Sequence, residues 1–310
     1  MMTADEFSRL ARLHANLNRR ALIHDYIRAF FKAQDFLEVD TPIRAPAVIP
    51  EANIEVYESE GWYLAASPEL HMKRLLAAGY DKLFQFSHCF RKSDRGLWHN
   101  PEFILLEWYR KGFGYLSMIH DMEQMTAAVA DNLGMGSTIT YRGRKIDITP
   151  PWQRITVRDA FINTSEWDPV TYYDPVRFDV EFIARVLPSF SPDRPTVLLD
   201  YPAPAASLAK LKPENRLVAE RAEVFIGGLE LANAYSELTD AGEQAVRFKD
   251  AIDEIKQERG KEMEAPHRFL DAVTRLPECG GIALGVDRLA MLFCDAASID
   301  EVMAFTSDDA

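Results

Sequence analysis

The chain of 310 residues contains only three cysteines, Cys89, Cys279 and Cys294, and none of them belongs to a C-x-x-C pair. This number and spacing exclude a disulfide framework and a cysteine zinc site. No apolar run approaches the roughly 20 residues that a membrane span requires. The N-terminal segment is amphipathic and charged, unlike a secretory signal. We therefore predict a cytoplasmic protein with no membrane partner.

Positive charge is also scarce, with 35 Lys and Arg residues against 48 Asp and Glu residues and a net charge of −13. An extended nucleic-acid surface needs clustered Lys and Arg, so this balance counts against one but leaves room for a local basic pocket. With 15 glycines and 17 prolines, the chain is neither collagen-like nor of low complexity. A hydrophobic content of 47% provides ample material for a core.

Apolar residues at helical and strand spacing predict an α+β fold. The predicted helices cover residues 3–34, 70–78, 115–133 and 241–260, and the predicted strands cover residues 36–42, 83–91, 101–109 and a hairpin at 217–238. A further strand runs into a helix over residues 281–293. Irregular alternation of strands and helices favours this class over a doubly wound sheet. We predict one domain over residues 1–310, with an insertion at about 135–200, where the pattern is mixed.

The strands predicted at 83–91 and 101–109 place chemically active side chains on one face. Alternation with period two puts Phe84, Leu106 and Trp108 on the opposite face. The open face carries Gln85, Arg91, Phe103, Glu107 and Tyr109. An ordinary hairpin with a polar face in water is one explanation. The aromatic rings count against it, because rings beside an arginine and a carboxylate suit a planar base, a phosphate and an ammonium.

A second segment pairs two carboxylates across a hairpin. Gly227-Gly228 between apolar runs predicts a two-residue turn. With that turn, Phe225 faces Glu230, and Glu223 lies one diagonal away on the same side. Two acids so close repel each other unless a cation lies between them, and oxygen ligands favour Mg²⁺. The alternative is two solvated acids on an edge hairpin.

Glu237 has the wrong parity to share a regular strand face with these acids. It joins them only if the backbone between Ala232 and Ser236 carries a bulge.

The third segment is a glycine-rich strand that turns into a helix, Gly280 to Leu289. Small residues at Gly281, Ala283 and Gly285 allow another group to approach the strand closely, and Arg288 lies near the start of the helix. Turns of this kind bind phosphates, although alone they are a weak signal.

Together these segments resemble the signature motifs of class II aminoacyl-tRNA synthetases, in particular the lysyl branch. Phe36 to Pro42 resembles motif 1, Phe90 to Phe103 resembles motif 2, and Gly281 to Leu289 resembles motif 3. The runs His99–Phe103 and Glu230–Leu238 are also similar to lysyl-type sequence. The resemblance implies a class II catalytic core, with an antiparallel sheet flanked by helices, and a homodimer.

Motif 1 begins as early as Phe36, so we expect no anticodon-binding domain ahead of it. A free-standing, acidic lysyl-type core resembles the elongation factor P–(R)-β-lysine ligase family, as do residues 201–209 and 217–223. That resemblance implies adenylation of (R)-β-lysine or lysine with ATP, followed by transfer to a lysine side chain of elongation factor P, with no tRNA. Ala283 stands where lysyl-tRNA synthetases usually have glycine. One methyl group is worth about 1–3 kcal/mol of discrimination, enough to bias between the two isomers.

The resemblance also assigns roles to residues. Arg91 and Arg288 would be catalytic and bind the phosphates, and Glu223 and Glu230 would hold Mg²⁺. The other ATP-binding residues would be Lys92, Ser93, His99, Asn100, Phe103, Leu231, Asn233 and Gly285, together with Glu230. The amino acid substrate would be bound by Ser67, Pro68, Glu69, Tyr109, Glu237 and Ala283.

One departure concerns motif 2, which usually reads Phe-Arg-x-Glu. Here it reads Phe90-Arg91-Lys92-Ser93, with Asp94 following. Asp94 replaces the missing carboxylate only if the strand has already ended, because one step along a strand reverses the side chain. This departure leaves open the alternative of a pseudoenzyme that acts as a binding module. A separate alternative keeps the enzyme but changes the acceptor, as a truncated paralogue that serves another protein or a small molecule.

Overall fold

Alternating apolar residues build a central sheet of nine strands in this computed structural model, which describes residues 4–308. Along the sheet the strands are β1 (Leu37–Glu38), β5 (Lys82–Phe90), β6 (Glu102–Lys111), β14 (Cys279–Gly285), β13 (Leu229–Ser236), β12 (Asn215–Ile226), β10 (Thr196–Pro202) and β9 (Gln153–Thr156), with β11 (Leu211–Lys212) paired to β12. The central pairs are antiparallel, whereas β1 with β5 and β9 with β10 are parallel. The predicted α+β class is confirmed, and the sheet is mixed at its two edges.

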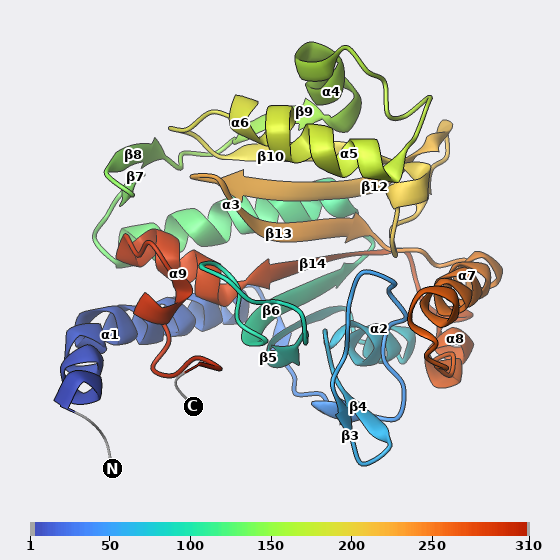
Figure 1. Cartoon of the computed structure of the whole chain (residues 1–310), viewed down its shortest axis with the longest axis horizontal. Helices are drawn as coiled ribbons and strands as arrows, with labels where there is room; N and C mark the ends of the chain where they lie inside the picture. Colours follow the sequence, from blue (N-terminus) through green and yellow to red (C-terminus); the bar gives the residue numbers. More distant parts are fainter. Residues whose placement is uncertain (1–3, 309–310) are drawn as a thin grey trace.

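One face of the sheet is covered by α1 (Ala4–Lys32), α3 (Tyr115–Asn132) and α9 (Val286–Cys294). Figure 1 shows α3 running along the back of β12 and β13. The main core lies between these helices and the strands, and it includes Phe31, Phe84, Leu106, Trp108 and Met122. The predicted alternation of β5 and β6 is therefore confirmed, and the opposite face is left for the site.

Residues 135–200, where the sequence pattern is mixed, extend the sheet. They supply β9 and β10, a separate hairpin of β7 (Thr138–Tyr141) and β8 (Arg144–Asp147), and the helical segments α4 (Val157–Ser165), α5 (Pro175–Glu181), η1 (Phe182–Val186) and α6 (Leu187–Ser189). A second apolar cluster joins Phe161 and Phe178 of these helices to Tyr201 and Phe225 of the strands. The segment thus packs on the sheet through its own aromatic core.

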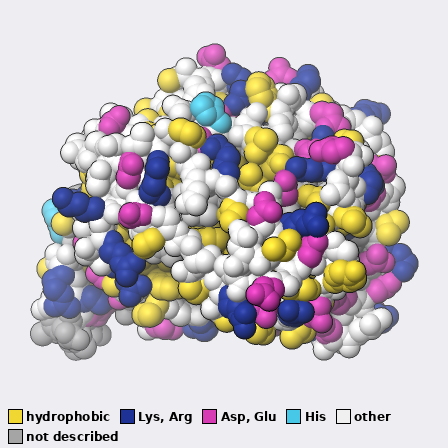
Figure 2. All heavy atoms as spheres, turned by 90° about the horizontal axis from the view of Figure 1, so that it is seen from above, with side chains coloured by type: hydrophobic (Ala, Val, Ile, Leu, Met, Phe, Trp, Pro, Cys, Tyr) yellow, Lys and Arg dark blue, Asp and Glu magenta, His cyan; other side chains and the backbone are white. Residues whose placement is uncertain are grey.

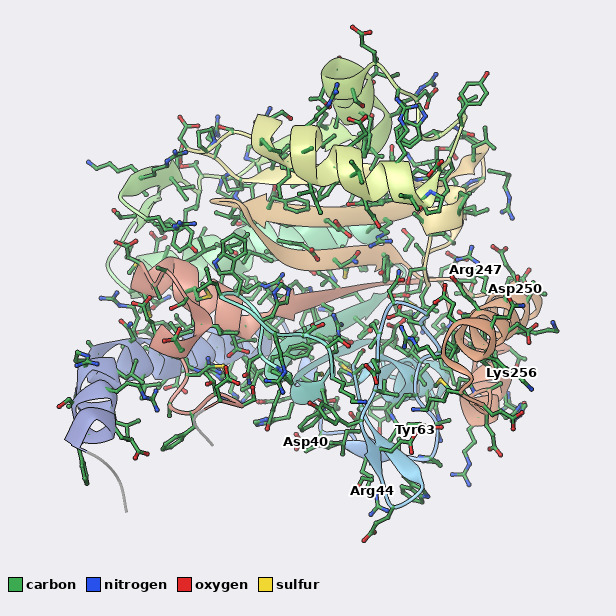
Figure 3. The ribbon with its side chains drawn as sticks, in the orientation of Figure 1. Asp40, Arg44, Tyr63, Arg247, Asp250 and Lys256 are labelled. Carbon is green, nitrogen blue, oxygen red and sulfur yellow. The ribbon has the colours of Figure 1, made fainter. Side chains whose placement is uncertain are left out.

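The other end of the sheet carries a small sheet of β2 (Arg44–Ala45), β3 (Glu58–Ser59) and β4 (Trp62–Leu64), and the helices α2 (Glu69–Ala77), α7 (Ala241–Arg259) and α8 (His267–Val273). Two single turns, η2 (Ala203–Ala205) and η3 (Ile299–Glu301), complete the order. The Asp240 carboxylate caps α7 by accepting a 2.9 Å hydrogen bond from the Glu243 amide. Arg247, labelled on α7 in Figure 3, donates to the carbonyl oxygens of Ser207 and Ala209 at 2.6 and 2.8 Å. Helix α7 thereby holds the segment that follows η2 against the sheet.

Acidic and basic side chains are interspersed over the face drawn in Figure 2, which shows no continuous basic stripe. Among residues 4–308, no helix combines the length and the apolar character that crossing a bilayer takes.

Candidate active site

The strand register aligns the site residues in two rows on the face opposite the main core. Residues directly opposite each other in antiparallel strands point to the same side. The first row runs across four strands through Glu107, Ala283, Asn233 and Glu223. The second row runs through Tyr109, Gly281, Tyr235 and Arg221. Residues from β6, β14, β13 and β12 therefore meet on one surface.

A β-bulge at Leu231 decides which glutamates share that surface. Glu230 pairs with Phe225 and Ala232 pairs with Val224, so Leu231 is the extra residue. Its side chain is buried in the main core, while Glu230 stays on the open face with Glu223. The bulge precedes Ala232, so the predicted position between Ala232 and Ser236 is wrong. The bulge restores the parity that also brings Glu237 to this face.

The predicted turn at Gly227-Gly228 is confirmed. The residues have φ angles of 60° and 85°, a left-handed conformation that glycine adopts without strain. The turn keeps β12 and β13 in the register that places the acids together.

A hollow with about 680 Å³ of empty volume lies at the end of β6, β13 and β14. Nine of the residues predicted to bind ATP line it, namely Arg91, His99, Asn100, Phe103, Glu230, Leu231, Asn233, Gly285 and Arg288. Lys92 and Ser93 are not among the lining residues. Both are exposed and bind the Glu55 carboxylate, at 2.6 and 3.0 Å.

Two guanidinium groups converge in this hollow. Arg288 Nη1 donates to the carbonyl oxygen of Glu230 at 2.7 Å, and its Nη2 lies 2.5 Å from His99 Nε2. Burial and the charge of Arg288 lower the pKa of His99, so the ring is neutral and accepts this hydrogen bond. The Arg91 guanidinium carbon lies 5.2 Å from the centre of the Phe103 ring. Two cations beside an aromatic ring suit a ligand with phosphates and a planar base.

Asp94 also lines the hollow. Strand β5 ends at Phe90 and the chain turns at Lys92 and Ser93, so the loop has begun before Asp94. This meets the condition under which Asp94 provides the carboxylate that position 93 lacks.

A cluster of buried acids lies along the second part of the face. Glu107, which is 1% exposed, accepts hydrogen bonds from the Ser67 hydroxyl at 2.7 Å and from the Tyr109 hydroxyl at 2.8 Å. Ser67 also accepts the amide of Glu69 at 3.0 Å, at the start of α2. Lys73 of α2 contacts the carboxylates of both Glu69 and Glu237. Five of the six residues predicted to bind the amino acid, Ser67, Glu69, Tyr109, Glu237 and Ala283, belong to this network or adjoin it, and Pro68 is the N-cap of α2.

Burial and mutual charge shift the pKa values of the residues in this cluster. Burial and the charge of Glu69 raise the pKa of Glu107 to about 7. Burial opposes a charge on Lys73, but Glu237 and Glu69 outweigh it and raise the pKa of the ammonium. The lysine is therefore a fixed cation, and Glu107 is half-protonated near neutral pH.

Glu223 and Glu230 form the second acidic pair. Glu223 accepts hydrogen bonds from the Tyr201 hydroxyl at 2.5 Å and from Arg221 at 2.6 Å. Crowding by protein atoms and the charge of Glu223 raise the pKa of Glu230 to about 7, although its side chain keeps contact with solvent. Within residues 4–308, no group of three His, Cys, Asp or Glu side chains could hold a metal. A metal at this pair would therefore need further oxygen ligands from a bound molecule.

The sequence reasoning missed three residues of the face. Lys73 follows Glu69 by four positions on the predicted helix, a spacing that pairs side chains, and this was the available signal. The half-buried Arg221 guanidinium lies near the rings of both Tyr201 and Tyr235, and its position follows only from the strand register. Glu51 lies in a loop without periodicity and accepts a 3.2 Å hydrogen bond from Ser207, so no local signal could have indicated it.

Comparison with known proteins gives a match over almost the whole length. The family of tRNA synthetases class II (D, K and N) matches residues 6–309. A protein of Klebsiella pneumoniae (strain 342), named elongation factor P–(R)-β-lysine ligase, is 37% identical over 312 residues, covering 95% of this chain and 96% of its own. Proteins of the same name from Proteus mirabilis (strain HI4320) and Hamiltonella defensa subsp. Acyrthosiphon pisum (strain 5AT) are 36% and 34% identical, each comparison covering 94% of both chains.

Proposed function

This chain belongs to the class II tRNA synthetase family, and we propose that it is an ATP-dependent ligase that attaches (R)-β-lysine to elongation factor P. In the first step, a carboxylate oxygen of (R)-β-lysine attacks the α-phosphorus of ATP, and pyrophosphate leaves. In the second step, a neutral lysine ε-amine of elongation factor P attacks the acyl carbon. An amide bond forms, AMP leaves, and the amine loses a proton.

One observation carries this proposal: the hollow that contains Arg91 and Arg288 and the acid cluster meet at Ala283. This residue lines the hollow and pairs with Glu107 of the acid cluster across β14 and β6. A molecule in the hollow and an amine-bearing molecule at the acids are therefore neighbours on one sheet face. Reacting groups held in this way react faster because their translational entropy has already been lost.

The side chains of the hollow bind and stabilise the nucleotide. Phe103 offers a face for adenine, and Arg91 beside it binds the α-phosphate, where negative charge develops. Arg288 binds the terminal phosphates, and the neutral His99 keeps its guanidinium in place. Catalysis rests on position and charge, because no side chain needs to act as a nucleophile.

The acid cluster binds the two ammonium groups of the amino acid. Glu237 and Tyr109 receive the side-chain ammonium, and Ser67 with Glu69 lie at the other amino group. Burial of an ammonium without such acids would be very costly. The Ala283 methyl group occupies space between the acid cluster and the hollow. It therefore affects which lysine isomer can place its carboxylate next to the nucleotide.

Glu223 and Glu230 fit a role in holding Mg²⁺. Both are oxygen donors on one face, and the charge of Glu223 already acts on Glu230. Mg²⁺ typically takes one or two carboxylates and completes its shell with phosphates, where it neutralises charge on a nucleotide. The chain acts as a single catalytic domain and forms a homodimer through α1 and β1. The exposed apolar side chains of Leu22 on α1 and Leu37 on β1 support such an interface. A cytoplasmic location and independence of tRNA follow the same proposal.

ATP–pyrophosphate exchange with a panel of amino acids tests the first step. We expect exchange that depends on (R)-β-lysine, with a weaker response to L-lysine. Equal exchange with unrelated amino acids would contradict the substrate, and no exchange together with no ATP binding in calorimetry would favour a binding module. Mass spectrometry of elongation factor P from cells that lack this gene tests the acceptor. An unchanged mass would point to another acceptor.

A further inference from the structure

A single ammonium sits among three buried carboxylates at the amino acid end of the site. Lys73 is 1% exposed and contacts both Glu69 and Glu237, which are 8% and 1% exposed. Glu107 is also 1% exposed, but its two oxygens accept hydrogen bonds only from neutral hydroxyls. Three carboxylates against one ammonium leave a formal charge of −2 in a buried place.

An excess of two negative charges is costly inside a protein unless a ligand compensates it. A structural ion pair would need one lysine and one acid, and the remaining two acids would then have no function. Near neutral pH the excess negative charge of the empty cluster is partly relieved by bound protons, because burial and the neighbouring acids raise the pKa of Glu107 to about 7 and that of Glu237 to about 8. Two ammonium groups of one ligand would balance the cluster with no proton at all.

Lys73 also determines where those groups bind. It bridges α2 and the end of β13, the two elements that carry Glu69 and Glu237. It contacts Oε2 of Glu237, whereas Oε1 of the same carboxylate faces Gly281. A Cβ atom at Gly281 would collide with this carboxylate and with the Tyr109 ring, so the glycine gives Glu237 its space beside Tyr109. One oxygen of Glu237 is thus held by Lys73, and the other lies beside Gly281.

From this geometry we infer that Lys73 is a positioning residue that fixes Glu69 and Glu237 and sets the cluster to accept a substrate with two ammonium groups. The inference rests on the proposed ligase function and adds the residue that selects diamino acids. Lys73 does not itself touch the reacting carboxylate in this account. Its role is to hold two acids in place and to cancel one of three negative charges.

The Lys73→Met variant tests the inference because methionine keeps most of the volume and removes the charge. Without the ammonium, Glu69 and Glu237 repel each other, and one of them takes up a proton at neutral pH. We expect the KM for (R)-β-lysine in pyrophosphate exchange to rise about ten- to hundredfold, with a smaller change in kcat. The KM for ATP should stay within about twofold, because Lys73 lies outside the hollow.

The pH profile separates this role from a merely structural one. Around Lys73 the titratable groups are Glu69 of α2, Glu107 and Tyr109 of β6, Glu237 after β13 and Cys279 of β14, with Glu51 in the neighbouring loop. Loss of the ammonium raises the pKa of the carboxyls, so the acidic limb of kcat/KM should move upward by about one pH unit or more. The matched control is Lys82→Met, because Lys82 donates to the Gln34 carbonyl at 2.9 Å and does not contact the cluster.

Analogues provide a second test that does not depend on the Lys73→Met variant. For the wild-type chain we expect 3-aminohexanoate and 6-aminohexanoate, each lacking one amine of β-lysine, to support much weaker exchange. In Glu69→Gln the cluster charge falls to −1, and the preference for the diamino acid over these analogues should narrow. If Lys73→Met does not fold, as judged by circular dichroism, these two measurements decide.

The possible results test the role of Lys73 separately from the proposed ligase function. A wild-type chain without exchange for any amino acid refutes the ligase function, and the inference falls with it. A wild-type chain that prefers (R)-β-lysine, while Lys73→Met keeps the KM and pH profile of Lys82→Met, overturns the inference alone. Equal use of diamino acids and the monoamino analogues overturns it as well.

Discussion

Ala283 lies directly opposite Glu107 across β14 and β6, so a residue of the nucleotide hollow stands beside an acid of the amine-binding cluster. The two parts of the site are therefore separated by a single small side chain. Any change in the size of that side chain alters how the carboxylate of the amino acid reaches the nucleotide.

Ala283→Gly should weaken the preference for (R)-β-lysine over L-lysine. Loss of one methyl group from the wall of a binding site changes the discrimination between two similar substrates by about 10-fold or more. The ratio of kcat/KM for the two isomers in pyrophosphate exchange measures it. Ala234→Gly is the matched control, because Ala234 is on the adjacent strand but faces the core. An equal shift in the control would mean that backbone freedom, and not the methyl, is responsible.

Arg91→Ala should lower kcat/KM by about 10²- to 10³-fold, as expected for loss of a group that stabilises developing charge. The melting temperature should change little, because the Arg91 guanidinium forms no ion pair within residues 4–308. Arg268→Ala, at an exposed position on α8, serves as control. Normal kinetics in Arg91→Ala would remove this residue from the mechanism.

Asp94→Asn should weaken ATP binding about tenfold, because the neutral amide loses a charge-assisted hydrogen bond in the hollow. Ser93→Ala should change ATP affinity little, since the Ser93 hydroxyl faces Glu55 outside the hollow. Calorimetric titration of both variants with ATP measures the difference. The assignment of Asp94 is wrong if the serine variant shows the larger loss.

The raised pKa of Glu107 predicts how stability depends on pH. Below pH 4.5 the carboxyl is protonated in the folded and the unfolded chain alike. Between about 4.5 and about 7 only the folded chain holds the proton, so this group's contribution to stability is lost as the pH rises through that window. The loss amounts to about 3 kcal/mol.

Denaturant unfolding of the wild type and of Glu107→Gln at pH 5 and pH 8 checks this effect. The glutamine variant cannot titrate at this position, so it should lose less stability over the same interval. Parallel behaviour of the two chains would show that Glu107 has an ordinary pKa. Addition of (R)-β-lysine should stabilise the wild type more at pH 8 than at pH 5, because Glu107 is then ionised.

Gly281→Ala should abolish productive binding of the amino acid. The added Cβ would collide with the Glu237 carboxylate and the Tyr109 ring, and such overpacking costs about 1–3 kcal/mol of stability. In Gly285→Ala the new Cβ would meet only Arg288, at 3.8 Å, so the melting temperature should fall less. Equal melting temperatures for the two variants would contradict the close approach at Gly281.

Local patterns predicted those parts of the molecule that depend on neighbouring residues in the chain. The alternation in β5 and β6 predicts the face that carries Glu107 and Tyr109, and Gly227-Gly228 predicts the turn, because both follow from backbone geometry over a few residues. The resemblance to family motifs contributed most of the residues that line the hollow.

Other features depend on how distant segments pack. The contact of Lys73 with Glu237 joins residues 164 positions apart, and it exists only after α2 has docked against the end of β13. The position of the bulge at Leu231 depends on which apolar side chain fits into the core. It therefore cannot be predicted from the alternation of apolar and polar residues along the strand. The parallel pairing of β9 with β10 likewise results from the packing of residues 135–200.

The extra residue at Leu231 has a bearing on how such sites are recognised in other chains. Glu230 and Glu237 are separated by an odd number of positions, yet both serve the same side of the sheet. A pattern search that requires even spacing between acids on one strand would reject this pair. Counting positions along a chain thus underestimates the number of strand-borne acid pairs, and a search that permits one inserted apolar residue would recover them.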